Sequence, residues 1–148
     1  MPSKPLPLIA GEVQLIDKSE KYFRQCHPSF FRNGQPTSQF VADFPRDEGR
    51  LSGTRSGSVN ATESYLDYSG SGGKTCGTWA VTLEEVDAQN ARLVDDTGCP
   101  PTNPPRLRGH TYLDFRNFDA GERKTAVSAL LIDFKNRGQQ AALGGSTP

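Results

Sequence analysis

The amino-acid sequence predicts a single α+β domain with a mainly antiparallel sheet, short helices and one long amphipathic C-terminal helix. Three observations predict this fold. Short segments in which apolar and polar residues alternate recur along the chain, as is typical of strands with one buried face. Helix-capping signals stand between these segments. Near the C-terminus, apolar residues recur at the spacing of a long helix with one buried face. Strands interspersed with helices in this order favour an α+β architecture.

The chain is expected to begin with a flexible N-terminal arm. Residues 1–11 contain three prolines and few candidates for a core. A short strand is predicted over 12–17, where Val13 and Leu15 alternate with polar residues. A second strand is predicted over 21–27, and the proline that follows it is expected to end it.

A hairpin is expected next. The sequence Asn-Gly-Gln-Pro at 33–36 is a turn signal, because Asn-Gly is the favoured dipeptide of tight hairpins. Residues 37–44 are interpreted as the strand after this turn, beside the strand over 21–27. Residues 45–59 are polar, contain three glycines and are expected to form a loop.

Helices and strands alternate in the middle of the chain. Asn60 and Glu63 have the spacing of a capping box, which predicts a short helix from residue 60. A central strand is expected over 75–83, around the single tryptophan. Thr82 and Glu85 repeat the capping-box spacing and predict a helical turn, and a short strand follows at 91–94.

The C-terminal part combines a loop, a strand and the longest helix. Residues 95–109 contain four prolines and two glycines and predict a loop, and 110–118 alternates like a strand. Asp119 is the expected N-cap of a helix that ends before Gly138. Residues 12–138 are therefore expected to form the domain, and 139–148 a disordered tail.

Charge and composition exclude several classes of protein. Lysine plus arginine equals aspartate plus glutamate, 17 each, which disfavours a dedicated nucleic-acid-binding protein. No apolar run is long enough for a membrane span, and the first residues lack the pattern of a signal peptide. The three cysteines do not form an even disulfide framework. A cytoplasmic protein is expected.

Several chemical motifs are rejected. The stretch at 69–75 is similar to a phosphate-binding loop, but Tyr68 occupies the position of its first glycine. No cysteine or histidine spacing indicates a metal site, so neither a metal nor a cofactor is expected. Cys26 and His27 point to opposite faces of the predicted strand, which disfavours a nucleophile activated by its neighbour. Adjacent acids such as Asp95-Asp96 are interpreted as caps or solvated loop charges.

The candidate site lies in the region 24–55, where polar side chains alternate with phenylalanines. If 22–31 and 37–44 pair as strands, one edge gathers a guanidinium, an imidazole and several hydroxyl groups above an aromatic floor. Arginine binds phosphate through paired donors, and aromatic rings stack on bases. Arg24 and His27 are the catalytic candidates. The ligand-binding candidates are Ser29, Thr37, Ser38, Gln39, Ser52 and Arg55. The alternative is that the phenylalanines form the core, Arg24 pairs with an acid and His27 merely ends a strand.

Residues 23–52 contain Arg-Gln-Cys-His-Pro-Ser, Gly-Gln-Pro-Thr-Ser-Gln and Asp-Glu-Gly-Arg-Leu-Ser. This succession resembles a pattern of small uncharacterised bacterial proteins. The resemblance implies a bacterial origin and carries over no activity. The order of Arg24 or His27, then Thr37-Ser38, then a later glutamate also resembles ADP-ribosyltransferase-type folds, in order alone.

Two functions are compatible with these observations. The first is binding of a nucleotide-like or other anionic small molecule at the Arg/His/Ser/Thr site, with or without turnover. The second is a non-enzymatic module that binds a protein partner, such as an immunity-type protein, and has no small-molecule site. The sequence leaves open whether the protein is an enzyme.

Overall fold

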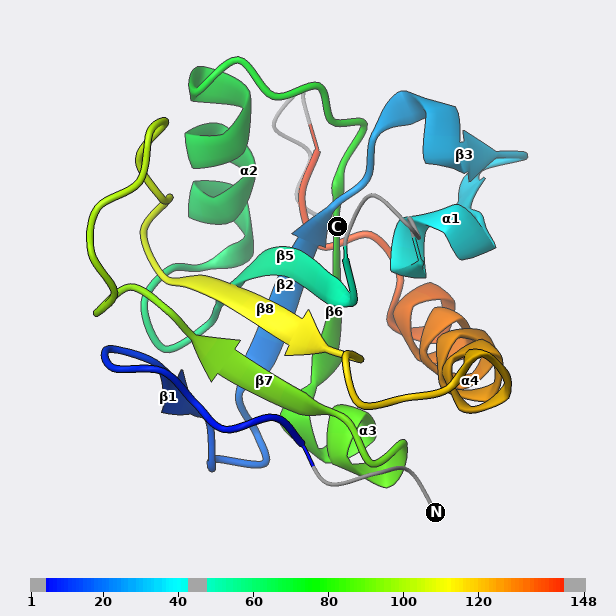
Figure 1. Ribbon diagram of the computed structural model, residues 1–148. Coiled ribbons are helices and arrows are strands. Elements are labelled where there is room, and N and C mark those ends of the chain that lie inside the picture. The colour runs from blue at the N-terminus through cyan, green and yellow to red at the C-terminus, as the bar shows by residue number, and fades with distance from the viewer. Residues whose placement is uncertain (1–4, 43–47, 143–148) are drawn as a thin grey trace.

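The computed structural model describes residues 5–42 and 48–142. In these residues six strands form one antiparallel sheet in the order β1-β7-β8-β5-β2-β6 (Figure 1). The strands are β1 (Val13–Gln14), β2 (Lys21–Gln25), β5 (Arg50–Arg55), β6 (Thr78–Thr82), β7 (Arg92–Asp95) and β8 (His110–Asp114). A separate hairpin joins β3 (Phe31–Arg32) to β4 (Gln35–Pro36). The predicted α+β class is confirmed.

The described helices are α1 (Ser38–Val41), α2 (Ala61–Gly70), α3 (Leu83–Ala88) and α4 (Ala120–Arg137), with a 3-10 helix at Pro28–Phe30. Three of them, α2, α3 and α4, begin where the capping signals predict them. Capping boxes start α2, α3 and α4, formed by Asn60 with Glu63, Thr82 with Glu85 and Asp119 with Glu122. Each box satisfies two backbone N–H groups that the first helical turn leaves unpaired.

The main core lies on the face of the sheet that α4 covers. Tyr22 of β2, Leu51 of β5 and Leu113 of β8 are buried there in one apolar cluster, together with side chains of the helices. Phe40 of α1 and Phe134 of α4 meet edge to face, with ring centroids 4.9 Å apart. These contacts fix the short helix α1 against α4.

The opposite face of the sheet is covered by α2, and Figure 1 shows α2 and α4 on opposite sides. Its apolar cluster is small and contains Phe23, Val59 and Ala80. Because successive residues of a strand point to opposite faces, β5 and β8 place most of their polar residues on this side. The sheet therefore has one apolar face and one face that is largely polar between β5 and β8.

The prediction of a strand over 37–44 is wrong. Ser38–Val41 forms helix α1, and β2 pairs with β5 and β6 instead. A short apolar run has no distinct period, and packing of Phe40 on α4 decides its conformation. The predicted turn is confirmed, since Asn33 and Gly34 adopt positive φ angles of 54° and 79° between β3 and β4.

The loop predicted over 45–59 is also wrong in part, because Arg50–Arg55 forms the inner strand β5. Gly53 lies against Tyr22, and a Cβ atom there would lie 2.4 Å from the Tyr22 Cε1 atom. The glycine that indicated a loop is thus required by close strand packing. Residues 43–47 of the predicted loop and strand lie outside the described residues.

Residues 139–142, expected in the tail, lie on the edge of β6. The Thr78 N–H donates to Ala141 O at 2.9 Å, and the Gln140 N–H donates to Thr78 O at 2.7 Å. Ala141 is buried. This segment therefore covers part of an edge strand, and residues 143–148 of the expected tail lie outside the described residues.

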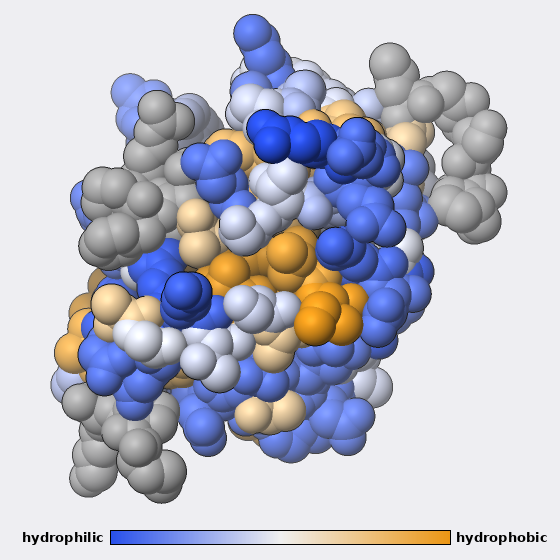
Figure 2. All heavy atoms as spheres, turned by 90° about the vertical axis from the view of Figure 1, so that its right-hand side faces the viewer, coloured by the Kyte–Doolittle hydropathy of each residue, from blue (hydrophilic) through white to orange (hydrophobic). Residues whose placement is uncertain are grey.

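The face that carries α1, α4 and β3 is mostly hydrophilic around a central apolar area (Figure 2). No helix within 5–42 and 48–142 has both the length and the apolar composition needed to cross a membrane.

Candidate functional site

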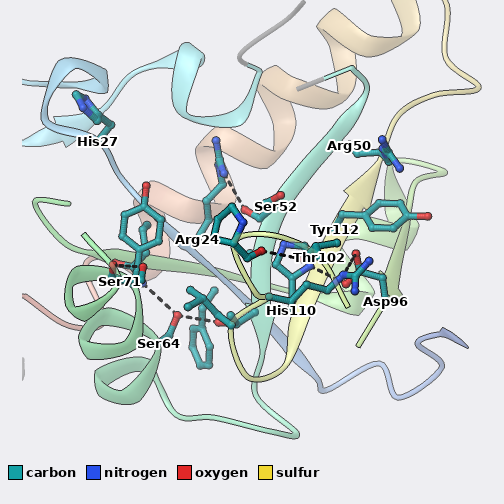
Figure 3. A pocket seen from close by; sticks show the side chains of 18 of the residues that line it. Arg24, His27, Arg50, Ser52, Ser64, Ser71, Asp96, Thr102, His110 and Tyr112 are labelled. Carbon is teal, nitrogen blue, oxygen red and sulfur yellow. Dashed lines mark hydrogen bonds and ion pairs between the residues drawn. The ribbon is translucent and has the colours of Figure 1, made fainter. Parts of the chain in front are cut away.

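A pocket of about 900 Å³ opens on the polar face of the sheet (Figure 3). Its floor comes from β5, β8 and the end of β2. Its walls come from α2, from the loop at residues 96–109 and from the 3-10 helix at Pro28–Phe30. The volume is within the range of pockets that hold small molecules.

The strand register places the side chains of the floor. Thr54 lies opposite His110 and Ser52 opposite Tyr112 in the antiparallel pair of β5 and β8. Leu51 and Leu113 alternate with these residues, so their side chains point to the opposite face of the sheet and pack in the core. The alternation that buries these leucines therefore turns hydroxyl and imidazole groups into the pocket.

Arg24 lies at the end of β2 and is held by backbone carbonyl groups. Its Nε donates to Phe40 O at 2.7 Å, and its Nη1 donates to Ser52 O at 2.7 Å. The guanidinium also lies over the Phe40 ring, 5.5 Å from its centroid. No carboxylate among the described residues forms an ion pair with Arg24, so its contacts there orient the charge without neutralising it.

Arg50 brings a second cation to the pocket. Its guanidinium lies 5.9 Å from the centroid of Tyr112 and 3.7 Å from the nearest Glu48 oxygen. The Arg50 and Glu48 side chains are 47% and 75% exposed, so this ion pair is weak. Arg106 also lines the pocket, 3.3 Å from Asp96. Among the described residues, the lining thus contains three arginines and two carboxylates.

His110 and Asp96 form a hydrogen-bonded pair in the same pocket. The Nδ1 atom of His110 lies 2.6 Å from Oδ1 of Asp96. A carboxylate can only accept, so Nδ1 carries the proton and the neutral ring has its lone pair on Nε2. Arg106 contacts the other oxygen of Asp96, which holds the carboxylate in place.

Buried hydroxyl and amide groups support the floor from the side of α2. Thr54 Oγ1 lies 2.7 Å from Ser64 Oγ, and Gln25 Nε2 donates to Ser64 Oγ at 3.1 Å. Gln25 also bonds Thr78 at 2.8 Å. Because each of these polar groups has a partner, the network fixes the floor rather than destabilising it.

Four of the predicted site residues line the pocket, namely Arg24, His27, Ser29 and Ser52. His27 caps the 3-10 helix, and its Nδ1 accepts from the Ser29 N–H at 3.1 Å. Figure 3 shows the His27 ring at one end of the pocket, away from the Arg24 guanidinium and from His110. The structure therefore does not bring the two predicted catalytic residues together.

The other four predicted residues, Thr37, Ser38, Gln39 and Arg55, are absent from the pocket lining. Thr37 precedes α1, and the packing of that helix on α4 draws the segment to the core side of the sheet. Arg55 has the parity of Leu51 and pairs with Glu20 at 2.7 Å and Asp95 at 2.8 Å. Its charge is neutralised by these acids.

Sequence reasoning missed His110, Asp96 and Arg50 as members of the site. His110 and Asp96 lie 14 residues apart, and Asp96 looked like one of two adjacent loop acids. Polar alternation along 50–54 was the available signal for the floor. This alternation was hard to recognise because one of the two positions between the polar residues is Gly53, where a strand with one buried face would normally have an apolar side chain.

The Cys26 thiol is not an accessible nucleophile. Cys26 is fully buried. Burial, together with the neighbouring Cys76, raises the pKa of the Cys26 thiol to about 12. Since the thiolate is the reactive form, Cys26 is expected to behave as a small core residue.

We expect Cys26 to resist alkylation in the native protein and to react fully after denaturation. The measurement is mass spectrometry of peptides after brief treatment with iodoacetamide at pH 8. Cys76, which is half-buried, is the internal control and should be labelled sooner. Equal labelling of the two thiols in the native protein would contradict this expectation.

Comparisons with known proteins found no match to this chain among protein-family models, curated proteins or solved structures. Within the described parts of the chain, no group of three or more histidine, cysteine, aspartate or glutamate side chains is placed to hold a metal ion.

Proposed function

We propose that the pocket binds a small anionic ligand of the nucleotide type. The observation that carries the proposal is the pair of arginines beside Ser52. Arg24 donates to the Ser52 carbonyl and has no described carboxylate partner, and Arg50 lies two residues from Ser52 on the same strand face. Guanidinium groups with donors left for a ligand bind phosphate strongly.

The rest of the lining suits the remainder of such a ligand. Hydroxyl groups of Ser52, Ser71 and Thr102 offer hydrogen bonds, and Phe23 and Tyr68 contribute aromatic surface. Aromatic side chains can stack on a nucleobase of any type. A pocket that combines cations, hydroxyl groups and aromatic surface can contact the phosphate, the sugar and the base of a nucleotide.

A thermal-shift screen with inorganic phosphate, nucleoside mono-, di- and triphosphates and NAD tests the proposal. A ligand at a hundredfold excess over its Kd stabilises the folded state by about 2.7 kcal/mol. For a chain of this length, we expect an increase in Tm of about 5–10 °C. The absence of a shift with every anionic ligand would contradict the proposal.

The variant Arg50→Gln should weaken binding at least about tenfold, because it removes a charge-assisted contact to phosphate. The matched control is Arg32→Gln, which removes the same charge from an exposed position of β3 outside the pocket lining. Equal weakening by both variants would indicate a general effect of charge and not a site.

A protein-interaction module is the alternative function. The described N-terminal segment exposes large apolar side chains, among them Ile9, Val13 and Ile16 at 62%, 58% and 87%. Exposed apolar side chains close in sequence are typical of surfaces that bind partners. Failure of all anionic ligands in the screen would favour this alternative.

A further inference from the structure

The His110–Asp96 pair has the arrangement of a general base. The carboxylate fixes the tautomer and the orientation of the imidazole ring, as an acid does for the histidine of hydrolytic triads. Nε2 forms no hydrogen bond with the described residues. Because the His110 ring lines the pocket, this basic nitrogen is available to a molecule bound there (Figure 3).

The strand register places His110 near the phosphate position of the proposed function. His110 lies opposite Thr54, so Ser52 is its diagonal neighbour on the same face of the sheet. Diagonal neighbours of this kind lie about 7–8 Å apart. A phosphate group hydrogen-bonded near Ser52, with one water molecule between phosphorus and Nε2, fits this distance.

The surroundings also indicate which bond is broken. A general acid for an alkoxide leaving group would be needed on the far side of the phosphorus atom. His27 lies at another end of the pocket, with Nδ1 engaged by Ser29 (Figure 3). A phosphate leaving group needs no proton, because it is stable as an anion. Hydrolysis of a phosphoanhydride therefore needs only the base that His110 can supply, whereas a phosphodiester with an alkoxide leaving group would need a general acid as well.

We propose that His110, positioned by Asp96, is the general base in hydrolysis of a nucleotide phosphoanhydride bound in this pocket. The inference rests on the proposed function. A water molecule attacks phosphorus and transfers a proton to Nε2 of His110. A new P–O bond forms, the bridging P–O bond breaks, and its electron pair departs with the leaving phosphate. His110 then releases the proton to solvent.

The Asp96 carboxylate accepts the hydrogen bond from Nδ1 of His110 throughout the reaction, and negative charge that develops on the phosphate is stabilised by Arg24 and Arg50. His110 is thus the catalytic residue, and Asp96 acts through it as a positioning residue.

The experiment incubates the full chain with ATP, ADP and NAD, with and without magnesium, and follows the products by phosphorus NMR. We expect hydrolysis by the wild-type protein and a fall in kcat of at least about a hundredfold in His110→Ala. Added imidazole should restore part of the activity, since it can occupy the vacated volume. Should His110→Ala fail to fold by circular dichroism, His110→Gln replaces it.

Asp96→Asn should lower kcat at least about tenfold with KM changed less than about twofold, because the ring loses its fixed tautomer. The matched control is Asp67→Asn, which removes an aspartate paired with Arg108 outside the pocket lining. This control should leave kcat unchanged. Unchanged kcat in Asp96→Asn would overturn the positioning role.

The outcomes separate this inference from the proposed function. Binding of the nucleotides without any hydrolysis overturns the catalytic inference and leaves the proposed function intact. Hydrolysis that persists in both His110 variants also overturns it. Failure of every tested compound to bind overturns both.

Discussion

Asp114→Asn is expected to reduce the free energy of unfolding by about 3–5 kcal/mol, because it leaves buried positive charge without its partner. Asp114 is 1% exposed in its side chain and accepts from Arg92 Nε at 2.9 Å. Arg116 Nε donates to the other oxygen at 2.9 Å. The Arg92 side chain is 9% exposed, so water cannot replace the lost carboxylate.

Urea unfolding followed by circular dichroism measures this effect. The matched control is Asp67→Asn, whose partner Arg108 is 58% exposed, and its cost should be at most about 1 kcal/mol. Equal losses in the two variants would show that the burial of Asp114 does not matter.

The same aspartate gives the protein an acid-sensitive contribution to stability. Burial alone would raise the pKa of Asp114, but hydrogen bonds from Arg116 and Arg92 lower it below its ordinary value near 3.8. The stability that the ionised Asp114 contributes is therefore complete at pH values above the ordinary pKa of 3.8. It is lost as the pH falls through the lowered pKa of Asp114 in the native state. The difference in unfolding free energy between wild type and Asp114→Asn should narrow below about pH 3.8.

Phe40→Ala is the second large effect, with an expected loss of about 3–5 kcal/mol in the free energy of unfolding. Phe40 is fully buried and contacts the rings of Phe134 and Trp79. Truncation leaves a cavity between α1, α4 and β6. It also removes the ring beneath the Arg24 guanidinium, so binding of an anionic ligand should weaken as well.

Thermal or urea unfolding measures the loss of stability in Phe40→Ala. The ligand screen, on the same preparation, measures the loss of binding. Phe40→Leu is the matched control, since it keeps much of the volume and should cost about 1.5 kcal/mol or less. A loss in Phe40→Ala no larger than in Phe40→Leu would mean that α1 packs less closely than described.

Elements specified by neighbouring residues were predictable. The capping boxes that begin α2, α3 and α4 join residues three apart, and Asn33-Gly34 makes its own turn. These signals depend on chain geometry within a few residues. Segments 37–44 and 50–55 were not predictable, because their sequences fit more than one local conformation and distant contacts select between them.

Part of the candidate site was predictable from the types of its residues. Arg24, His27, Ser29 and Ser52 do line one pocket, and their residue types indicated it. The predicted hairpin partner, Thr37-Ser38-Gln39, lies elsewhere because Phe40 packs on α4. A single buried aromatic ring outweighs the weak preference of a four-residue segment for a strand.

The sequence by itself determined the α+β class, the starts of α2, α3 and α4 and the turn at 33–34, since the signals for them are residues close along the chain. Only the tertiary structure decided which polar groups meet. The Arg24–Ser52 contact spans 28 residues and the His110–Asp96 pair spans 14. Strand order and register bring them together, and these are fixed by burial of the opposite face of the sheet.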